Sequence, residues 1–273
     1  MGRTRVFLAV LGSAAVGFVV GSRELLRHQA RVARTAIGKP LGEEAPYADQ
    51  VFKPSYGQPV ELLLLGDSIA AGLGAETPKG TLGARLAKGL AKASLRSVRL
   101  TTGAVVGAES SMVADQIAVL PPDYRADVAV IVVGGNDVTH RVPVAESLQH
   151  LREAITALQK RGTAVVVGTC PDLGMLRPVP QPLRSLGARA SRQLAAAQRE
   201  LALDCGAYAV SLADVVGPFF ITNPDEMFSL DRFHPSALGY KRTAKAMLPS
   251  VLAALGLRDA VPFGHHAPVG FLR

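Results

Sequence analysis

Three side chains in this sequence, a serine, a histidine and an aspartate, occur in short blocks where they could carry out acyl transfer. Ser68 lies in the block Gly66-Asp67-Ser68, and Asp231 and His234 lie in Asp231-Arg232-Phe233-His234-Pro235. A serine hydroxyl is a poor nucleophile at neutral pH, so it needs an imidazole that takes its proton. The imidazole needs an acceptor on its other nitrogen, and an aspartate three residues upstream can fold back to supply it. These residues indicate a Ser-His-Asp relay.

Two further blocks contain groups that could stabilise negative charge, residues 103–107 and Gly134-Gly135-Asn136-Asp137. Backbone N–H groups and an asparagine amide are typical donors to the oxyanion of acyl transfer, and losing one costs about 3 kcal/mol. Asp67 has two interpretations, a turn-forming or helix-capping residue and a catalytic group. Ser68 also has a structural interpretation, because serine is common in glycine-rich turns.

The elements that must position these blocks alternate along the chain. Short apolar runs, typical of strands covered on both faces, occupy residues 60–65, 97–101, 128–133, 164–169 and 207–212. Helical segments lie between and after them, at residues 82–92, 111–120, 144–160, 186–203 and 237–255. This alternation predicts a parallel sheet with helices on both faces. Functional residues gather at the carboxyl ends of such strands, and three of the four blocks follow a strand directly.

In order and position, the four blocks resemble those of the SGNH, or GDSL-type, hydrolases. The similarity covers roughly residues 58–256. It implies an α/β fold, a flavodoxin-like three-layer α/β/α sandwich with a five-stranded parallel sheet in the order 2-1-3-4-5. It also implies serine ester hydrolysis without a metal ion or other cofactor. The block around Ser68 lacks the Gly-x-Ser-x-Gly motif, which argues against the α/β-hydrolase fold.

The resemblance also assigns a role to each matching residue. It implies that Ser68 is the nucleophile, that His234 is the general base and that Asp231 orients the histidine. The N–H groups of Ser68 and Gly107 and the side chain of Asn136 would form the oxyanion hole. The chain departs from the family pattern before Gly107, where residues 102–104 are Thr-Gly-Ala instead of a stretch that often contains asparagine.

Two segments are expected to rim a substrate pocket. Residues 171–182 follow the fourth strand and contain Met175 and Leu176, and residues 217–230 precede the aspartate and contain Phe219 and Phe220. These side chains could hold an acyl chain. The alternative is that the aromatic residues only pack against the last helix.

The other histidines and the two cysteines have simpler interpretations. His140 could contact a substrate, but an exposed loop position is the favoured interpretation. His265 and His266 lack the carboxylate or cysteine cluster that a metal site needs. Cys170 and Cys205 fall at opposite ends of neighbouring predicted strands, too far apart for a disulfide.

Charge is distributed unevenly over the 273 residues. The whole chain carries a net charge of +8, of which residues 1–39 contribute +6 and residues 40–273 only +2. A basic protein invites a nucleic-acid interpretation, but the domain has no basic patch interleaved with aromatic residues. We therefore expect no nucleic-acid partner. The predicted organisation is an N-terminal segment (1–39), a linker (40–58), a hydrolase domain (59–257) and a C-terminal tail (258–273).

The N-terminal segment predicts membrane targeting. Seventeen uncharged residues, 6–22, lie between arginines and would span about 26 Å as a helix, slightly less than a hydrocarbon core. A secretory signal peptide, an uncleaved membrane anchor and a buried helix of the domain all remain open. The expected location is the cell envelope, by secretion or anchoring, whereas the arginines after the run favour a domain tethered on the cytoplasmic side.

The expected activity is that of a serine esterase or lipase acting on small or lipid esters. The same fold hosts other acyl-transfer chemistries, so a carbohydrate O-acetyl esterase, a thioesterase and an acyltransferase are alternatives. A further alternative is an envelope-binding protein that has kept an inactive hydrolase pocket. The sequence gives no prediction of the oligomeric state.

Overall fold

The centre of the molecule is a seven-stranded sheet. The computed structural model describes the backbone of residues 2–40 and 42–268 and the side chains of residues 20–40 and 42–268. The five predicted strands are present as β2 (Pro59–Gly66), β3 (Ser97–Thr102), β4 (Val128–Val132), β5 (Ala164–Gly168) and β6 (Tyr208–Val210). They pair in parallel in the order β3-β2-β4-β5-β6, which confirms the predicted order 2-1-3-4-5.

The prediction of a purely parallel, five-stranded sheet is wrong at both edges. β1 (Val51–Phe52) pairs antiparallel with β3, and β7 (His265–His266) pairs antiparallel with β6. These two strands fall in the segments predicted as a linker and as a C-terminal tail. Each has only two residues, too few to produce an alternating pattern in the sequence. They cover edges that would otherwise expose unpaired backbone groups.

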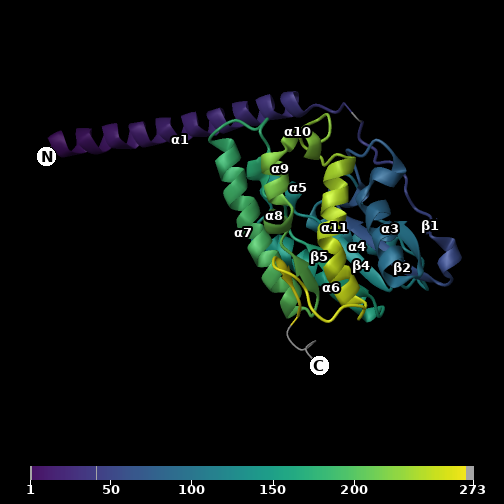
Figure 1. The fold of residues 1–273 in the computed structure, drawn as a ribbon. Coiled ribbons are helices and arrows are strands. Elements are labelled where there is room, and N and C mark those ends of the chain that lie inside the picture. The colour runs from purple at the N-terminus through teal and green to yellow at the C-terminus, as the bar shows by residue number, and fades with distance from the viewer. Residues whose placement is uncertain (1, 41, 269–273) are drawn as a thin grey trace.

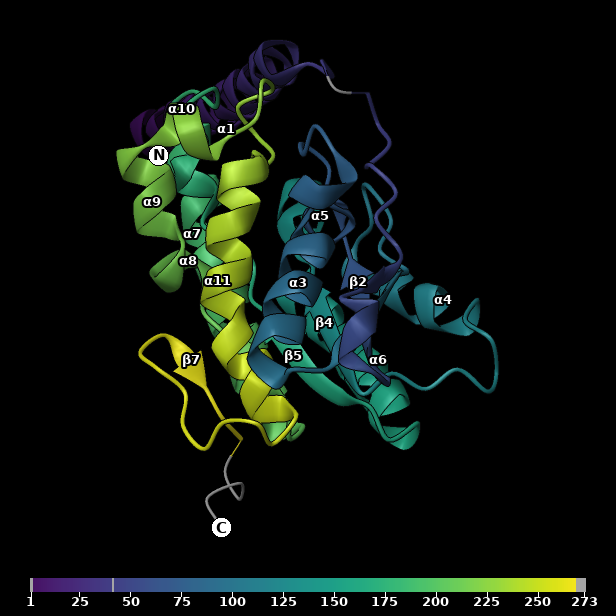
Figure 2. The same ribbon diagram turned by 45° about the vertical axis from the view of Figure 1, so that its right-hand side comes forward.

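Helices cover both faces of this sheet (Figures 1 and 2). One face packs against α3 (Leu82–Ser94) and α11 (Ala237–Ala254), and the other against α4 (Val113–Ala118), α6 (Val144–Lys160) and α7 (Leu183–Asp204). Successive side chains of a strand point to opposite faces. Accordingly, Leu62 and Leu64 of β2 join the first core, whereas Leu63 and Leu65 join the second. The five predicted helices of the domain are therefore confirmed, α6 with the predicted bounds and the other four with shifted ends.

Five short helices were not predicted from the sequence, and one of them begins at residue 212, the last residue of a run predicted as a strand. They are α2 (Ser68–Ala71), α5 (Gly135–His140), α8 (Leu212–Val215), α9 (Gly217–Thr222) and α10 (Pro224–Met227). One or two turns are too short to show helical periodicity. Three of them begin within three residues of a strand end, so they shape the edge of the sheet where the chemistry-bearing blocks lie.

The N-terminal segment forms one helix, α1 (Gly2–Ile37), which runs across the end of α7 and projects beyond the domain (Figure 1). The predicted apolar run 6–22 lies within α1, but its side chains up to residue 19 are outside the described residues. In the part of the chain that the structure describes, no helix combines the length and apolar character needed to cross a membrane.

Candidate active site

Ser68 is held at a tight turn between β2 and α2. Gly66 has φ +125°, and a Cβ at this position would lie 1.9 Å from the carbonyl oxygen of Val132, so the turn requires glycine. The side-chain amide of Gln116 bonds both the N–H and the C=O of Gly66, each at 2.8 Å. Asp67 caps α2 by accepting the N–H of Ile69 at 2.9 Å. These contacts hold the backbone of the turn that carries Ser68.

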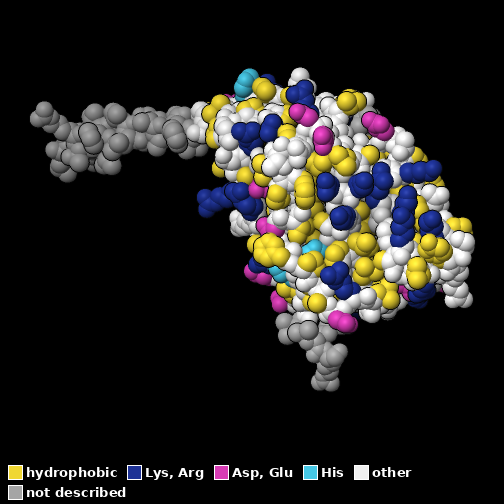
Figure 3. All heavy atoms as spheres, viewed as in Figure 1, with side chains coloured by type: hydrophobic (Ala, Val, Ile, Leu, Met, Phe, Trp, Pro, Cys, Tyr) yellow, Lys and Arg dark blue, Asp and Glu magenta, His cyan; other side chains and the backbone are white. Residues whose placement is uncertain are grey.

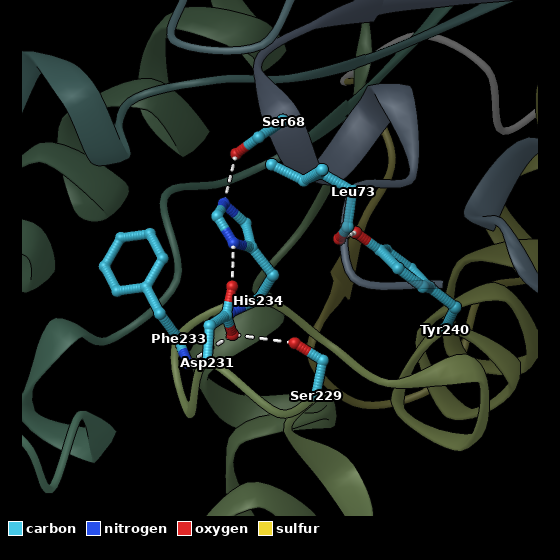
Figure 4. Close-up of polar contacts among 7 residues, drawn as sticks. All are labelled: Ser68, Leu73, Ser229, Asp231, Phe233, His234 and Tyr240. Carbon is cyan, nitrogen blue, oxygen red and sulfur yellow. Dashed lines mark hydrogen bonds and ion pairs between the residues drawn. The ribbon is translucent and has the colours of Figure 1, made fainter. Parts of the chain in front are cut away.

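The structure brings the three predicted catalytic residues together (Figure 4). The Ser68 hydroxyl lies 3.0 Å from Nε2 of His234, and Nδ1 of His234 lies 2.6 Å from Oδ2 of Asp231. The other carboxylate oxygen of Asp231 accepts the Ser229 hydroxyl at 2.7 Å and the N–H groups of Phe233 and His234 at 2.9 Å. The loop therefore folds back within one turn, as the three-residue spacing predicts.

Asp231 is ionised at neutral pH. Burial opposes ionisation, but the hydrogen bonds from His234, from Ser229 and from the backbone outweigh it and lower the pKa of this carboxyl from 3.8 to about 2. A carboxylate in this state accepts the N–H on Nδ1 of the imidazole, which leaves Nε2 free to accept the proton of Ser68. The geometry is that of a proton relay.

A second contact joins the serine turn to the histidine loop. The C=O of Ser68 accepts the N–H of Leu73, and the C=O of Leu73 accepts the buried hydroxyl of Tyr240 at 2.5 Å. The next residue, Gly74, has φ +101°, and a Cβ there would lie 2.8 Å from Cβ of His234. The turn after α2 therefore rests directly on the loop that carries the histidine, and Tyr240 ties it to α11.

Tyr240→Phe is expected to lower kcat about tenfold with little change in KM. The substitution leaves the carbonyl of Leu73 buried without its donor and loosens the turn that sets the Ser68–His234 distance. Tyr208→Phe is the matched control, because the Tyr208 hydroxyl likewise donates to a backbone carbonyl, that of Ala253 in α11, which is far from the site. Both variants should lose thermal stability, and equal esterase rates in the two would contradict this role for Tyr240.

The predicted oxyanion residues lie on neighbouring loops. Asn136, in α5, lines the pocket, and its amide donates to the C=O of Ala108 at 2.9 Å. The buried carboxylate of Asp137 accepts the N–H of Ser110 at 3.1 Å, so α5 is tied twice to the loop after β3. Gly107 is exposed on this loop with φ +83° and lies outside the pocket lining.

Asp67 adds a second buried carboxyl beside the relay. Burial raises the pKa of Asp67 from 3.8 to about 7, because it outweighs the hydrogen bond from Ile69 and the attraction of His234. The nearby charge of Asp137 acts in the same direction as burial. Of its two interpretations, the contacts support the helix cap.

An apolar pocket of about 750 Å³, part of it open to solvent, adjoins Ser68 and His234. Of the four residues predicted to contact a substrate, Met175, Leu176 and Phe220 line it. Phe219 does not: its side chain is partly exposed and lies under the guanidinium of Arg242, 4.8 Å from the ring centre. Successive residues of a short helix point in different directions, so only one of the two phenylalanines of α9 reaches the pocket.

The pocket has further lining residues that were not predicted from the sequence. They include Leu173, Leu212 at the start of α8, Val216 between α8 and α9, and Gly217 at the start of α9. Leu212 and Val216 are four residues apart, the spacing of one helix face, but the run is too short for that pattern to stand out.

The remaining histidines and Cys205 are outside the pocket lining, whereas the buried Cys170 directly precedes Pro171, which lines the pocket. His140 is exposed at the end of α5 and pairs with Glu109 at 2.6 Å. His265 and His266 belong to β7 and bond the hydroxyls of Ser250 and Ser211. Cys170 and Cys205 are free thiols. Among the described residues, no three or more His, Cys, Asp or Glu side chains are grouped so that they could hold a metal ion.

The sheet and the polar residues at its carboxyl edge define an α/β protein of the hydrolase type. The chain belongs to the GDSL-like lipase/acylhydrolase family, whose model matches residues 64–242, and it is therefore a carboxylic ester hydrolase. It is 38% identical to a GDSL-like esterase of Mycobacterium tuberculosis, over 95% of this chain and 84% of that protein.

Solved structures of lower identity share the fold. The esterase EstA from Pseudoalteromonas is 18% identical, with a TM-score of 0.57 over 72% of this chain and 99% of that chain. An acetyl xylan esterase, AlAXEase, is 21% identical, with a TM-score of 0.54 over 69% of this chain and 98% of that chain. At these identities the likeness concerns the fold alone.

Proposed function

We propose that this esterase works through an acyl-enzyme formed on Ser68. The observation that carries the proposal is the unbroken set of hydrogen bonds from the Ser68 hydroxyl through His234 to Asp231, beside an apolar pocket. Oγ of Ser68 attacks the ester carbonyl while Nε2 of His234 takes its proton. The tetrahedral intermediate then expels the alcohol, which receives that proton. Water, deprotonated by His234, attacks the acyl group, releases the acid and restores Ser68.

The developing oxyanion is stabilised by N–H donors at the same edge of the sheet. The first two proposed donors, the backbone N–H of Ser68 and the side-chain amide of Asn136, belong to residues that line the pocket. An amide nitrogen carries two hydrogens, so the bond from Asn136 to Ala108 leaves one N–H for the substrate. The N–H of Gly107 is the third proposed donor.

The substrate we propose is an ester with an apolar acyl chain, from a lipid or a shorter acyl ester. The pocket beside the serine is walled by aliphatic and aromatic side chains, among them Leu176, Val216, Phe220 and Phe228. An acyl chain buried there gains about 0.8 kcal/mol for each methylene group removed from water. A sugar that carries an O-acetyl group has no comparable apolar surface to bury.

Labelling with a fluorophosphonate probe tests the nucleophile. We expect one probe per molecule, with the modification mapped by mass spectrometry to the peptide that contains Ser68. Heat-unfolded protein is the control, because only the assembled relay activates the hydroxyl. Labelling of another residue, or none, would overturn the proposal and favour a non-catalytic binding protein.

A panel of esters tests the substrate class on the same preparation. We expect kcat/KM to rise from nitrophenyl acetate to longer nitrophenyl esters, and to exceed the value for O-acetylated sugars. Faster turnover of an acetylated sugar would favour the carbohydrate esterase, and faster turnover of an acyl thioester would favour the thioesterase. If an added alcohol is acylated in larger amount than free acid is released, the protein is an acyltransferase.

A further inference from the structure

The basic N-terminal helix is fixed against the rim of the pocket. The side chain of Gln29 is buried, with Gln29 only 7% exposed; it donates to the C=O of Gln181 and accepts the N–H of Leu183 at 3.0 Å. Ala33, one turn further along α1, is buried as well. Gln181 closes the loop 171–182, and other residues of this loop line the active-site pocket. The contact therefore joins α1 to the loop that borders the pocket.

This contact brings together two strongly basic segments that are distant in the sequence. Residues 20–37 and 171–192 contain eight arginines and two acidic residues, a net charge of +6 in a chain whose total is +8. Figure 3 shows Lys and Arg side chains at the end of the molecule where α1 meets the domain. The eight arginines are Arg23, Arg27, Arg31, Arg34, Arg177, Arg184, Arg189 and Arg192. We call these residues the basic face.

Aliphatic side chains lie exposed on the same helix. Val20, Leu25 and Val32 are 55%, 47% and 41% exposed. At about 100° per residue, Val20 lies on the same side of α1 as the arginines, whereas Leu25 and Val32 lie on the other side. The arginine side of α1, which also carries Val20, can rest on a lipid layer with its charges among the headgroups. Nucleic-acid sites combine positive charge with aromatic side chains, and residues 20–37 contain none.

We propose that the basic face binds the surface of an anionic lipid layer and holds the pocket rim against it. Charge complementarity selects the lipid, because the two segments that carry the basic face have a net charge of +6. Residues 171–182, whose last residues contact α1, also border the apolar pocket. The inference concerns where the esterase works. It does not depend on the roles proposed for Ser68, His234 and Asp231.

Sedimentation with vesicles tests this proposal on the full-length protein. We expect binding to vesicles of phosphatidylcholine mixed with phosphatidylglycerol, little binding to phosphatidylcholine alone, and release by added salt. Arg31→Gln combined with Arg34→Gln should weaken binding roughly 25-fold, since each arginine at an anionic surface strengthens it about fivefold. The matched control is Lys88→Gln with Lys92→Gln, which removes two exposed charges from α3 and should leave binding unchanged.

Three outcomes of the vesicle experiment would contradict the proposal. Equal binding to neutral and anionic vesicles would overturn the proposal and assign the attachment to apolar residues alone. Equal weakening of vesicle binding by both double variants would show that the basic face is not the binding surface. Tighter binding to an anionic oligonucleotide than to anionic vesicles would identify a nucleic acid, and not a lipid, as the partner. Hydrolysis of soluble nitrophenyl acetate should be the same in all variants, so failure here is distinguishable from failure of the proposed reaction.

Discussion

Ser68→Ala is expected to lower kcat for ester hydrolysis by at least about 10⁴-fold. The substitution removes the hydroxyl oxygen that lies 3.0 Å from Nε2 of His234, and with it the atom proposed to form the acyl-enzyme. The backbone N–H of residue 68 and the amide of Asn136 remain, so the residual rate reports what the oxyanion donors contribute without the nucleophile.

Two controls separate loss of chemistry from loss of folding. Ser68→Ala removes one hydroxyl from a turn that Gln116, Asp67 and Leu73 hold through backbone and capping contacts, so the thermal midpoint should change little. Ser250→Ala removes another buried hydroxyl, which bonds His265 at the opposite end of α11, and should retain full activity. Undiminished hydrolysis by the Ser68→Ala variant would exclude the acyl-enzyme.

The central sheet could be predicted because its strands are buried on both faces. Val128–Val132 and Ala164–Gly168 are continuous apolar runs, and such runs are typical of parallel strands under helices. The edges could not be predicted in the same way. Whether a two-residue segment pairs depends on where the chain passes an open edge, and this is set by the packing of elements distant in sequence.

The proximity of Ser68, His234 and Asp231 could be predicted for a different reason. The types and the three-residue spacing of Asp231 and His234 are dictated by chemistry, and they appear in the sequence whatever surrounds them. The contacts that hold the relay have no such signature. The bond from Tyr240 to Leu73 joins residues 167 positions apart, and nothing in either segment indicates the other.

The lining of the pocket could be predicted only in part. Residues 171–182 and 217–230 were selected because they flank chemistry-bearing blocks and contain apolar side chains, and both segments contribute lining residues. Their side-chain directions required the structure, since Phe219 and Phe220 are adjacent and only Phe220 faces the pocket.

Asp231→Asn is expected to lower kcat about 10⁴-fold while Ser68 and His234 stay in place. An amide can donate to Nδ1 of His234, which favours the tautomer that carries its proton on Nε2. That tautomer cannot accept the proton of Ser68. Ser229→Ala is the graded comparison: it removes one of the hydrogen bonds to the Asp231 carboxylate and should cost far less activity. Rates of the two variants within tenfold of each other would contradict the orienting role.

The substitution Asp231→Asn should also change how the stability of the protein depends on pH. The pKa of Asp231 is lowered from 3.8 to about 2 in the folded protein, so the ionised carboxylate stabilises the fold above about pH 4, and this contribution is lost as the pH falls towards 2. The amide that replaces this carboxylate in the variant has no charge to lose. The difference in thermal midpoint between the wild type and the Asp231→Asn variant should therefore narrow from pH 5 to pH 2. The control is Asp225→Asn, at a more exposed aspartate of α10, whose thermal midpoint should stay close to that of the wild type over the same range. A constant gap for Asp231→Asn would mean that the carboxylate is not held by the bonds that align the relay.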